Sequence, residues 1–254
     1  MQLPSHSPAR RRIEGSGTTE PSWIGSPHIL DLEPAESADW AMRFARIWIL
    51  APHPDDEILA LGGTLAKLSQ QGADIRIISV TDGEASHRQS TAWSPERLTE
   101  VRPLEMLRGL GQLGVEAEVI RLGLPDGRVG AHRAGLLKTL AERVDKEDLL
   151  LATCRFDGHP DHEACGDVAV LAGELSGATV FEYPVWMWHW ALPHEASIPW
   201  ARAKRLPIDA GIVARKRAAL DEFKSQVEPD GPRPPILPPH VLPRFLRPFE
   251  VVFT

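Results

Sequence analysis

Short apolar runs alternate with helix-like segments along the middle of the chain. Five runs have the length and β-branched content of buried strands, and they cover residues 47–50, 73–80, 117–122, 149–154 and 179–183. Between them, apolar residues recur at helical spacing, as after the first run in residues 58–68. This alternation predicts an α/β fold with a Rossmann-like, mostly parallel sheet and helices on both faces. With 254 residues and no internal repeat, we expect a single domain.

The two ends of the chain differ from this central part in composition. Residues 1–38 are rich in Pro, Ser, Gly, Glu and Arg, which indicates a polar N-terminal tail. The predicted domain covers residues 39–227, and its later helices are expected around 94–113, over 131–144, after His162 and over 211–226. Residues 228–254 begin proline-rich and end apolar, so we expect a C-terminal extension that packs back on the domain.

Residues with metal-binding and acid–base side chains follow the first and the fourth predicted strand. His53, Asp55, Asp56 and Glu57 come directly after the first strand, and residues 159–162 come after the fourth. The carboxyl ends of parallel strands meet at one edge of the sheet, where ligands bind. A phosphate-binding turn would carry glycines, whereas this turn carries carboxylates that repel phosphate. Two histidines and one carboxylate, with positions left open for water, are typical of a catalytic divalent-metal site.

The resemblance to a known family rests on two motifs, His53-Pro54-Asp55-Asp56-Glu57 and His159-Pro160-Asp161-His162. With both in this order, the chain resembles the PIG-L/LmbE-like family of zinc-dependent N-deacetylases. The likeness runs from about residue 46 to residue 226, and it includes segments 81–84, 102–105 and 122–127. It implies a hydrolase that uses Zn²⁺, or another divalent ion such as Fe²⁺, to remove an N-acetyl or related N-acyl group. The implied substrate contains an amino sugar of the N-acetylglucosamine type.

The resemblance also implies a role for each residue of the site. His53, Asp56 and His162 would bind the metal. A water activated by that metal would attack the amide with Asp55 as the general base, and His159 would stabilise the oxyanion. Substrate contacts would come from residues after other strands and on the next helix, namely Arg102, Asp126 and Asp82.

A dense aromatic segment after the fifth strand adds two candidates, Trp186 and Trp188. Their rings either pack a long connection or line the mouth of the pocket and stack on a sugar face. Other candidates also have simpler explanations, since Asp55 can cap a helix and Arg102 can pair with Glu105.

Two positions depart from relatives of the resembled family. Asp157 stands where the branch that acts on thiol-sugar precursors carries a tyrosine that helps catalysis, and Phe223 stands where relatives often carry His or Tyr. The metal-binding motifs are unaffected by either change, so both positions bear on the choice of substrate.

Three alternative functions can be weighed against the same residues. Two histidines and a carboxylate also hold Fe²⁺ in oxygen-activating enzymes. A metal-dependent amidase acting on a non-sugar conjugate would need the same centre. A non-enzymatic protein that binds small molecules would be expected to lack catalytic groups, and none is missing here.

Net charge, apolar runs and cysteine content limit which partners and which cellular compartment we expect. A net charge of −7 and a pI near 5.8 argue against a nucleic-acid or anionic-membrane partner, although residues 10–12 are a short run of arginines. The sequence shows neither a membrane-spanning apolar run nor a secretory core, so we expect a cytoplasmic protein. Cys154 and Cys165 lack a paired spacing and should be reduced and buried. Nothing in the sequence fixes the oligomeric state.

Overall fold

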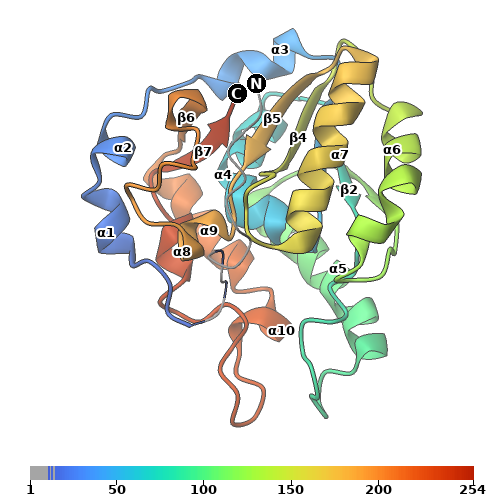
Figure 1. Ribbon diagram of the computed structural model, residues 1–254, viewed down its shortest axis with the longest axis vertical. Coiled ribbons are helices and arrows are strands. Elements are labelled where there is room, and N and C mark those ends of the chain that lie inside the picture. The colour runs from blue at the N-terminus through green and yellow to red at the C-terminus, as the bar shows by residue number, and fades with distance from the viewer. Residues whose placement is uncertain (1–10, 12, 14) are drawn as a thin grey trace.

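The computed structural model describes residues 11, 13 and 15–254. Its fold is built on one central sheet (Figure 1). In this part of the chain the sheet has seven strands in the order β3-β2-β1-β4-β5-β7-β6. Five are parallel, and β7 runs antiparallel to β5 and β6. The strands are β1 (Ile47–Ala51), β2 (Ile75–Ser79), β3 (Glu118–Arg121), β4 (Leu149–Thr153), β5 (Thr179–Tyr183), β6 (Ala203–Pro207) and β7 (Phe249–Phe253). The predicted mostly parallel α/β fold is confirmed.

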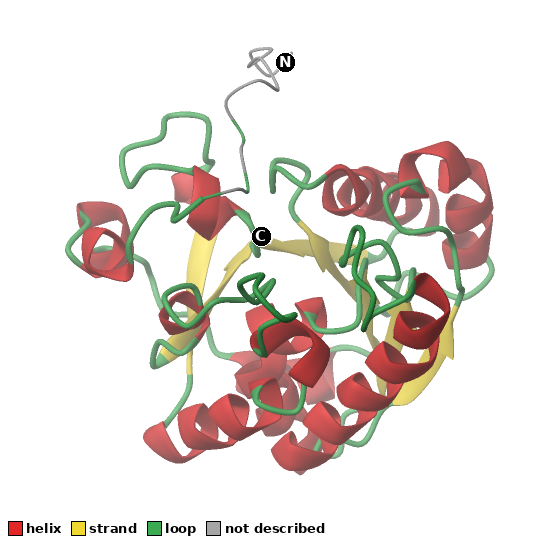
Figure 2. Cartoon of the chain, turned by 90° about the horizontal axis from the view of Figure 1, so that it is seen from below, coloured by secondary structure: helices red, strands yellow, loops and turns green. Residues whose placement is uncertain are grey.

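Helices cover both faces of the sheet (Figure 2). One face packs against α4 (Asp56–Gln70), α5 (Pro95–Leu113) and α9 (Ala210–Leu220), and the other against α6 (Arg133–Ala141) and α7 (Pro160–Ser176). The remaining helices are short: α1 (Glu20–Ile24), α2 (Pro27–Leu30), α3 (Trp40–Arg43), α8 (Met187–Trp190) and α10 (Lys224–Val227), with 3-10 turns at Ser37–Asp39, Val129–His132, Trp200–Arg202 and Leu242–Phe245.

Strand β1 lies in the middle of the sheet because every one of its side chains is apolar and buried. Side chains alternate between the two faces of a strand, so Ile47 and Ile49 join one core while Trp48 and Leu50 join the other. The strand order reverses direction between β1 and β4, its neighbour on the other side. Ligands bind at such a reversal point, beyond the carboxyl ends of the strands.

Both ends of the described chain contact the central domain. Trp23 of α1 is fully buried, and its Nε1 donates to the carbonyl of Trp188 at 2.8 Å. Strand β7 lies inside the sheet, between β5 and β6. The boundaries near residues 38 and 228 mark changes in composition and stay predictions. Of the arginine run at residues 10–12, only Arg11 is among the described residues.

One predicted helix is wrong in its extent. We expected one continuous helix over 211–226. Instead, α9 ends at Leu220 and a separate helix, α10, begins at Lys224. The break occurs because Phe223 is buried between them and Glu105 of α5 holds Ser225, accepting its backbone N–H at 2.8 Å and its hydroxyl at 2.6 Å. In the part of the chain that the structure describes, no helix combines the length and apolarity needed to cross a membrane.

Candidate metal centre

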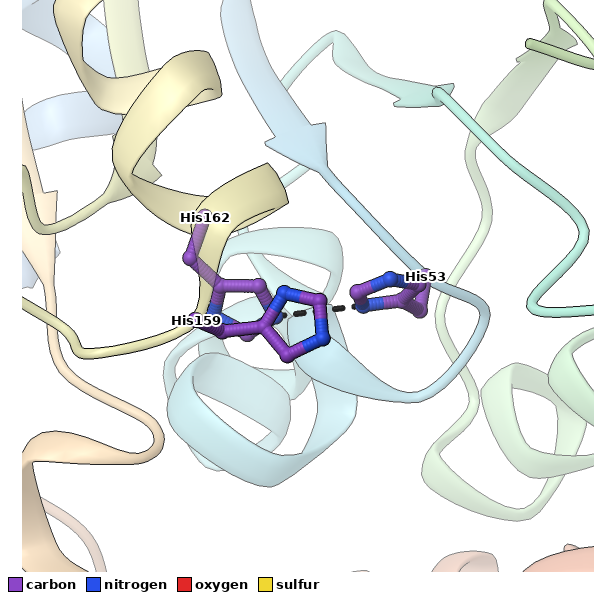
Figure 3. Close-up of side chains that lie close together, drawn as sticks. All are labelled: His53, His159 and His162. Atoms are coloured by element: carbon purple, nitrogen blue, oxygen red, sulfur yellow. Dashed lines mark hydrogen bonds between the residues drawn. The ribbon is translucent and has the colours of Figure 1, made fainter. Parts of the chain in front are cut away.

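Three donor atoms from the two motifs converge at the point where the strand order reverses. His53 Nδ1 lies 3.1 Å from His162 Nε2, as Figure 3 shows. Asp56 Oδ2 lies 3.2 Å from each of these two nitrogens. Metal bonds of about 2.0 Å in a tetrahedral site place the ligand atoms about 3.3 Å apart. The spacing of these three atoms therefore fits a Zn²⁺-sized ion, and all three side chains are buried.

Local hydrogen bonds hold the two motifs in place. In the turn after β1, the backbone N–H of His53 donates to Asp56 Oδ2 at 2.9 Å, which fixes the carboxylate beside the imidazole. The first turn of α7 is anchored to β4 because Thr153 Oγ1 donates to the carbonyl of His162 at 2.9 Å. The two motifs thus rest on adjacent central strands rather than on free loops.

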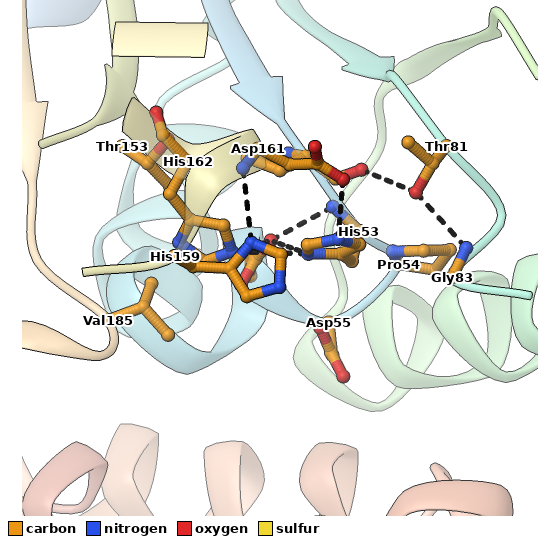
Figure 4. A network of polar contacts seen from close by, with 12 residues as sticks. His53, Pro54, Asp55, Thr81, Gly83, Thr153, His159, Asp161, His162 and Val185 are labelled. Carbon is orange, nitrogen blue, oxygen red and sulfur yellow. Dashed lines mark hydrogen bonds and ion pairs between the residues drawn. The ribbon is translucent and has the colours of Figure 1, made fainter. Parts of the chain in front are cut away.

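The second nitrogen of each imidazole faces a carboxylate. His53 Nε2 lies 3.1 Å from Asp126 Oδ1. It also lies 3.6 Å from Oδ2 of Asp161, which Figure 4 shows above His53. His162 Nδ1 lies 2.7 Å from Asp157 Oδ2. Metal-binding histidines characteristically donate their other N–H to a carboxylate in this way, which fixes the tautomer and the ring orientation.

Two other groups among the described residues also have donor atoms near one another. They are His53, His159 and His162, and His53, Asp126 and Asp161, with atoms within 4.8 Å. The set with Asp56 is tighter and uses the nitrogens that do not face Asp126 or Asp157. The choice of His53, Asp56 and His162 as ligands therefore stays our prediction.

Charge at the site is dominated by buried carboxylates. Burial opposes the protonation of His162, but Asp56 and Asp157 outweigh it and raise its pKa to about 9. The pKa of His53 is likewise raised well above its usual value, against burial, by hydrogen bonds to Asp126, Asp161 and Asp56. Burial raises the pKa of Glu57 to about 8. A bound divalent cation would replace the imidazole protons as the positive charge here.

Asp55 lies at the N-cap position of α4, yet its carboxylate does not cap the helix. Its φ of 145° is outside the usual range for an L-residue, and such strain is often found at functional sites. Burial raises the pKa of Asp55 to about 7, although the positive charge of Arg102 opposes this. The simpler explanation of Asp55 as a helix cap therefore does not describe its side chain.

Arg102 of α5 connects the loops that follow β1 and β2. Its Nη2 donates to Asp55 Oδ2 at 2.8 Å and to the carbonyl of Pro54 at 3.0 Å, and its Nη1 donates to the carbonyl of Gly83 at 3.0 Å. The alternative ion pair with Glu105 is wrong, because Glu105 instead binds Ser225 of α10. The substrate contact predicted for Arg102 is untested.

His159 is half-buried and close to His53 and His162, the two histidines that we predict to bind the metal. Its ring centroid lies 4.8 Å from that of His53 and 4.9 Å from that of His162. Its Nδ1 accepts the backbone N–H of Asp161 at 3.2 Å, so the proton of the neutral ring lies on Nε2. Burial, with the charges of His53 and His162, lowers the pKa of His159 to about 3. His159 is thus a neutral hydrogen-bond donor.

The other predicted substrate residues lie at the same edge but have partners of their own. Both carboxylate oxygens of Asp82 bind Arg121, and Asp126 binds His53 and accepts the backbone N–H of Ala85 at 2.9 Å. These contacts place Asp126 against His53, which we predict to bind the metal. The substrate roles of Asp82 and Asp126 stay predictions.

The two tryptophans differ in burial. Trp188 is 3% exposed, its ring centroid lies 5.0 Å from that of Trp23 in a T-shaped pair, and the Arg247 guanidinium lies 4.2 Å from its ring. This is the packing arrangement that we gave as the alternative to sugar stacking. Trp186 is half-buried, 5.8 Å from the ring of His189. The substrate roles of both rings are untested.

The sequence prediction missed the contact between Asp157 and His162. Asp157 was noted only as a departure from relatives, and its contact with His162 depends on how the loop after β4 folds back on α7. The carboxylate of Asp161 accepts the N–H groups of Gly127 at 2.6 Å and Val129 at 3.1 Å and faces His53, a contact that the sequence prediction also missed. A carboxylate close in sequence to a predicted metal-binding histidine is the only signal that the sequence offers for either role.

Comparison with known proteins identifies the family. Residues 48–172 match the PIG-L family, described as GlcNAc-PI de-N-acetylase. A 1D-myo-inositol 2-acetamido-2-deoxy-alpha-D-glucopyranoside deacetylase of Streptomyces avermitilis is 30% identical over 203 residues, which are 69% of this chain and 67% of that protein. A second enzyme of this name, deacetylase 1 of Catenulispora acidiphila, is 28% identical over 204 residues, which are 68% of this chain. The chain spans only 60% of the length of that second relative.

Solved structures agree on the fold. The N,N'-diacetylchitobiose deacetylase of Pyrococcus horikoshii superposes with a TM-score of 0.59 at 21% identity, covering 76% of this chain and 74% of that one. Taken with the sequence matches, this likeness leads to one conclusion: the chain belongs to the PIG-L/LmbE-like family of deacetylases.

Proposed function

We propose that this protein is a metal-dependent hydrolase that removes an N-acetyl or related N-acyl group from an amino-sugar-containing substrate. The observation that carries the proposal is the set of three donor atoms 3.1–3.2 Å apart, with Asp55 and His159 beside it. The names of the relatives support it, since the curated deacetylases act on an acetamido-glucopyranoside of inositol and the Pyrococcus enzyme acts on diacetylchitobiose. An acetamido sugar is common to both.

The metal would be held by His53 Nδ1, Asp56 Oδ2 and His162 Nε2. Mixed nitrogen and oxygen donors in a three-ligand set suit Zn²⁺ and also Fe²⁺, and we propose Zn²⁺. Such an ion acts as a Lewis acid that polarises a carbonyl and makes water more acidic.

Asp55 would accept the proton of the attacking water. Its other role is to pair with Arg102, which also donates to the carbonyl of Pro54 in the same loop and to that of Gly83 in the loop after β2. His159 would donate from Nε2 to the oxygen that becomes negative as the acetamide carbonyl is attacked, and preorganised donors of this kind stabilise a transition state by about 2.7–4 kcal/mol. Asp55, protonated in the first step, would then give that proton to the departing amine, since neutral His159 has only the Nε2 proton with which it holds the oxyanion.

The acceptor half of the substrate would contact Arg102, Asp126, Asp82, Trp186 and Trp188. Of the two tryptophans, Trp186 offers more exposed ring in the present arrangement. We also propose a cytoplasmic location, which two unpaired, buried cysteines support. The partner we propose is a small glycoconjugate rather than a nucleic acid, because the net charge is −7.

The test is acetate release from a panel of N-acetylglucosamine conjugates. Protein loaded with one equivalent of Zn²⁺ or Fe²⁺ should release acetate and free amine in equal amounts without consuming oxygen, and His162→Ala should not. Oxygen consumption would favour the Fe²⁺ alternative, and release from N-acetylated amino acids alone would favour an amidase for non-sugar conjugates. Metal binding with no turnover of any conjugate would contradict the proposal.

A further inference from the structure

Asp157 forms an unusually complete set of hydrogen bonds beside the metal centre. It lies in the loop after β4 and is fully buried. Its Oδ2 accepts from His162 Nδ1 at 2.7 Å and from the backbone N–H of Trp186 at 2.8 Å. Its Oδ1 accepts from the N–H groups of Val185 at 2.8 Å and Met187 at 3.0 Å. One carboxylate therefore connects a metal-binding histidine with the start of α8.

We propose that Asp157 is the positioning residue of His162: it holds the proton on Nδ1 and so directs the Nε2 lone pair toward the metal. The proposal rests on the proposed function, because it takes His162 to be a metal ligand.

A count of donors and acceptors supports this role. An ionised carboxylate offers about four acceptor sites and no donor. Three of the four partners are backbone N–H groups, which can only donate, so the carboxylate must accept from all of them. The nearest group left for Oδ2 is His162 Nδ1, and that contact is favourable only when Nδ1 carries a proton. His162 Nε2 is then free to face Asp56 Oδ2 at 3.2 Å and His53 Nδ1 at 3.1 Å.

An asparagine could not take over this set of contacts. Its side chain has nearly the same shape, but one oxygen becomes an NH₂ group that would point at donors. Whichever way the amide is turned, two of the four N–H groups lose their acceptor. If the NH₂ faces His162, the imidazole is favoured with its proton on Nε2, the nitrogen that must bind the metal.

The same residue also fixes the other end of α8. The backbone carbonyl of Asp157 accepts from Trp190 Nε1 at 2.9 Å, and a Cβ on the adjacent Gly158 would lie 2.7 Å from the Trp190 ring. Val185, which precedes α8 and is labelled in Figure 4, donates its backbone N–H to Asp157 Oδ1 at 2.8 Å. Asp157 thus sets the position of His162 relative to the aromatic segment that we expect at the mouth of the site.

The experiment compares Asp157→Asn with Glu182→Gln. Glu182 is an equally buried carboxylate at the end of β5 that accepts from the backbone N–H, Nε and Nη2 of Arg155, without contacting a proposed ligand. We expect Asp157→Asn to weaken Zn²⁺ affinity, measured by competition with a chelator, by about 10- to 100-fold. Glu182→Gln should change that affinity by less than about 2-fold, even if both variants unfold at a lower urea concentration. Equal affinities of Asp157→Asn and wild type would overturn the proposal.

A second measurement needs no variant. In the zinc-loaded wild-type protein, long-range ¹H–¹⁵N spectra should place the His162 proton on Nδ1 and the metal on Nε2. The reverse assignment would overturn the proposal even if Asp157→Asn failed to fold. A wild-type protein that binds no Zn²⁺ or Fe²⁺ would instead contradict the proposed function, so the two failures are distinguishable.

Discussion

Arg102 Nη2 lies 2.8 Å from Asp55 Oδ2, and both side chains are almost fully buried. The carboxylate that we propose as general base is therefore held by a cation from α5, a helix on which the sequence predicted a substrate contact. This pairing gives Asp55 a fixed direction in addition to a charge.

The substitution Asp55→Asn tests the role of Asp55 as a base separately from its hydrogen bond to Arg102. The amide oxygen can still accept from Arg102, so we expect the fold and the metal content to remain. Turnover should fall by about 10²- to 10⁴-fold, because an amide cannot take a proton from water. Metal content and acetate release should be measured on one preparation. Near-normal turnover in Asp55→Asn would place the base elsewhere.

The choice of ligands is tested by comparing Asp56→Ala with His159→Ala. Asp56 belongs to the tight set of donor atoms, whereas His159 belongs to a looser set of three histidines. We expect Asp56→Ala to lose bound metal on dialysis and His159→Ala to keep one ion per chain while losing most turnover. The opposite pattern in elemental analysis would identify the three histidines as the ligands.

Gly83 is required where Arg102 crosses the loop after β2. Its φ is +66°, and an added Cβ would lie 1.6 Å from Arg102 Nη1. Gly123 is a matched control, because its φ is +62° and its Cβ would meet no atom within 4 Å.

We expect Gly123→Ala to lower the free energy of unfolding by about 1–2 kcal/mol, the cost of the left-handed backbone alone. Gly83→Ala should cost more, because Arg102 must move and each hydrogen bond that it loses contributes about 0.5–1.5 kcal/mol. Urea unfolding measures both values. Equal losses in the two variants would mean that Arg102 is not held against Gly83 as described.

The two cysteines should be unreactive in the folded protein. Both thiols are free and buried, and burial raises the pKa of each well above its usual value, so the reactive thiolate is scarce at pH 8. A thiol reagent should therefore detect none of the two thiols in native protein and both after denaturation in urea. Fast modification of the native protein would contradict the packing of Cys154 and Cys165.

The five parallel strands could be predicted because each contains adjacent apolar residues and lies between segments with helical spacing. Strands β6 and β7 were not predicted as part of the sheet. Strand β6 carries half-buried Lys204 and Arg205, which hide its period, and the apolar β7 gave no sign that it would insert beside β5. Pairing with a strand far away in sequence depends on tertiary contacts that a local pattern does not contain.

In the site, too, local sequence patterns predicted some residues, while others depend on tertiary contacts. The histidines and carboxylates that follow β1 and β4 could be named because parallel strands bring their carboxyl ends together. Their partners could not, because the contacts of Asp157 and Asp126 depend on side-chain directions in loops. Arg102 was placed on the correct helix, but its hydrogen bond to Asp55 follows from packing between α5 and two loops.

The most direct measurement is hydrolysis of an N-acetylglucosamine conjugate in H₂¹⁸O by the metal-loaded protein. If the protein cleaves the amide with water, mass spectrometry should find one ¹⁸O atom in each acetate released and none in the amino sugar. The absence of acetate, or label that enters only from ¹⁸O₂, would contradict the assignment of this protein as a hydrolytic deacetylase.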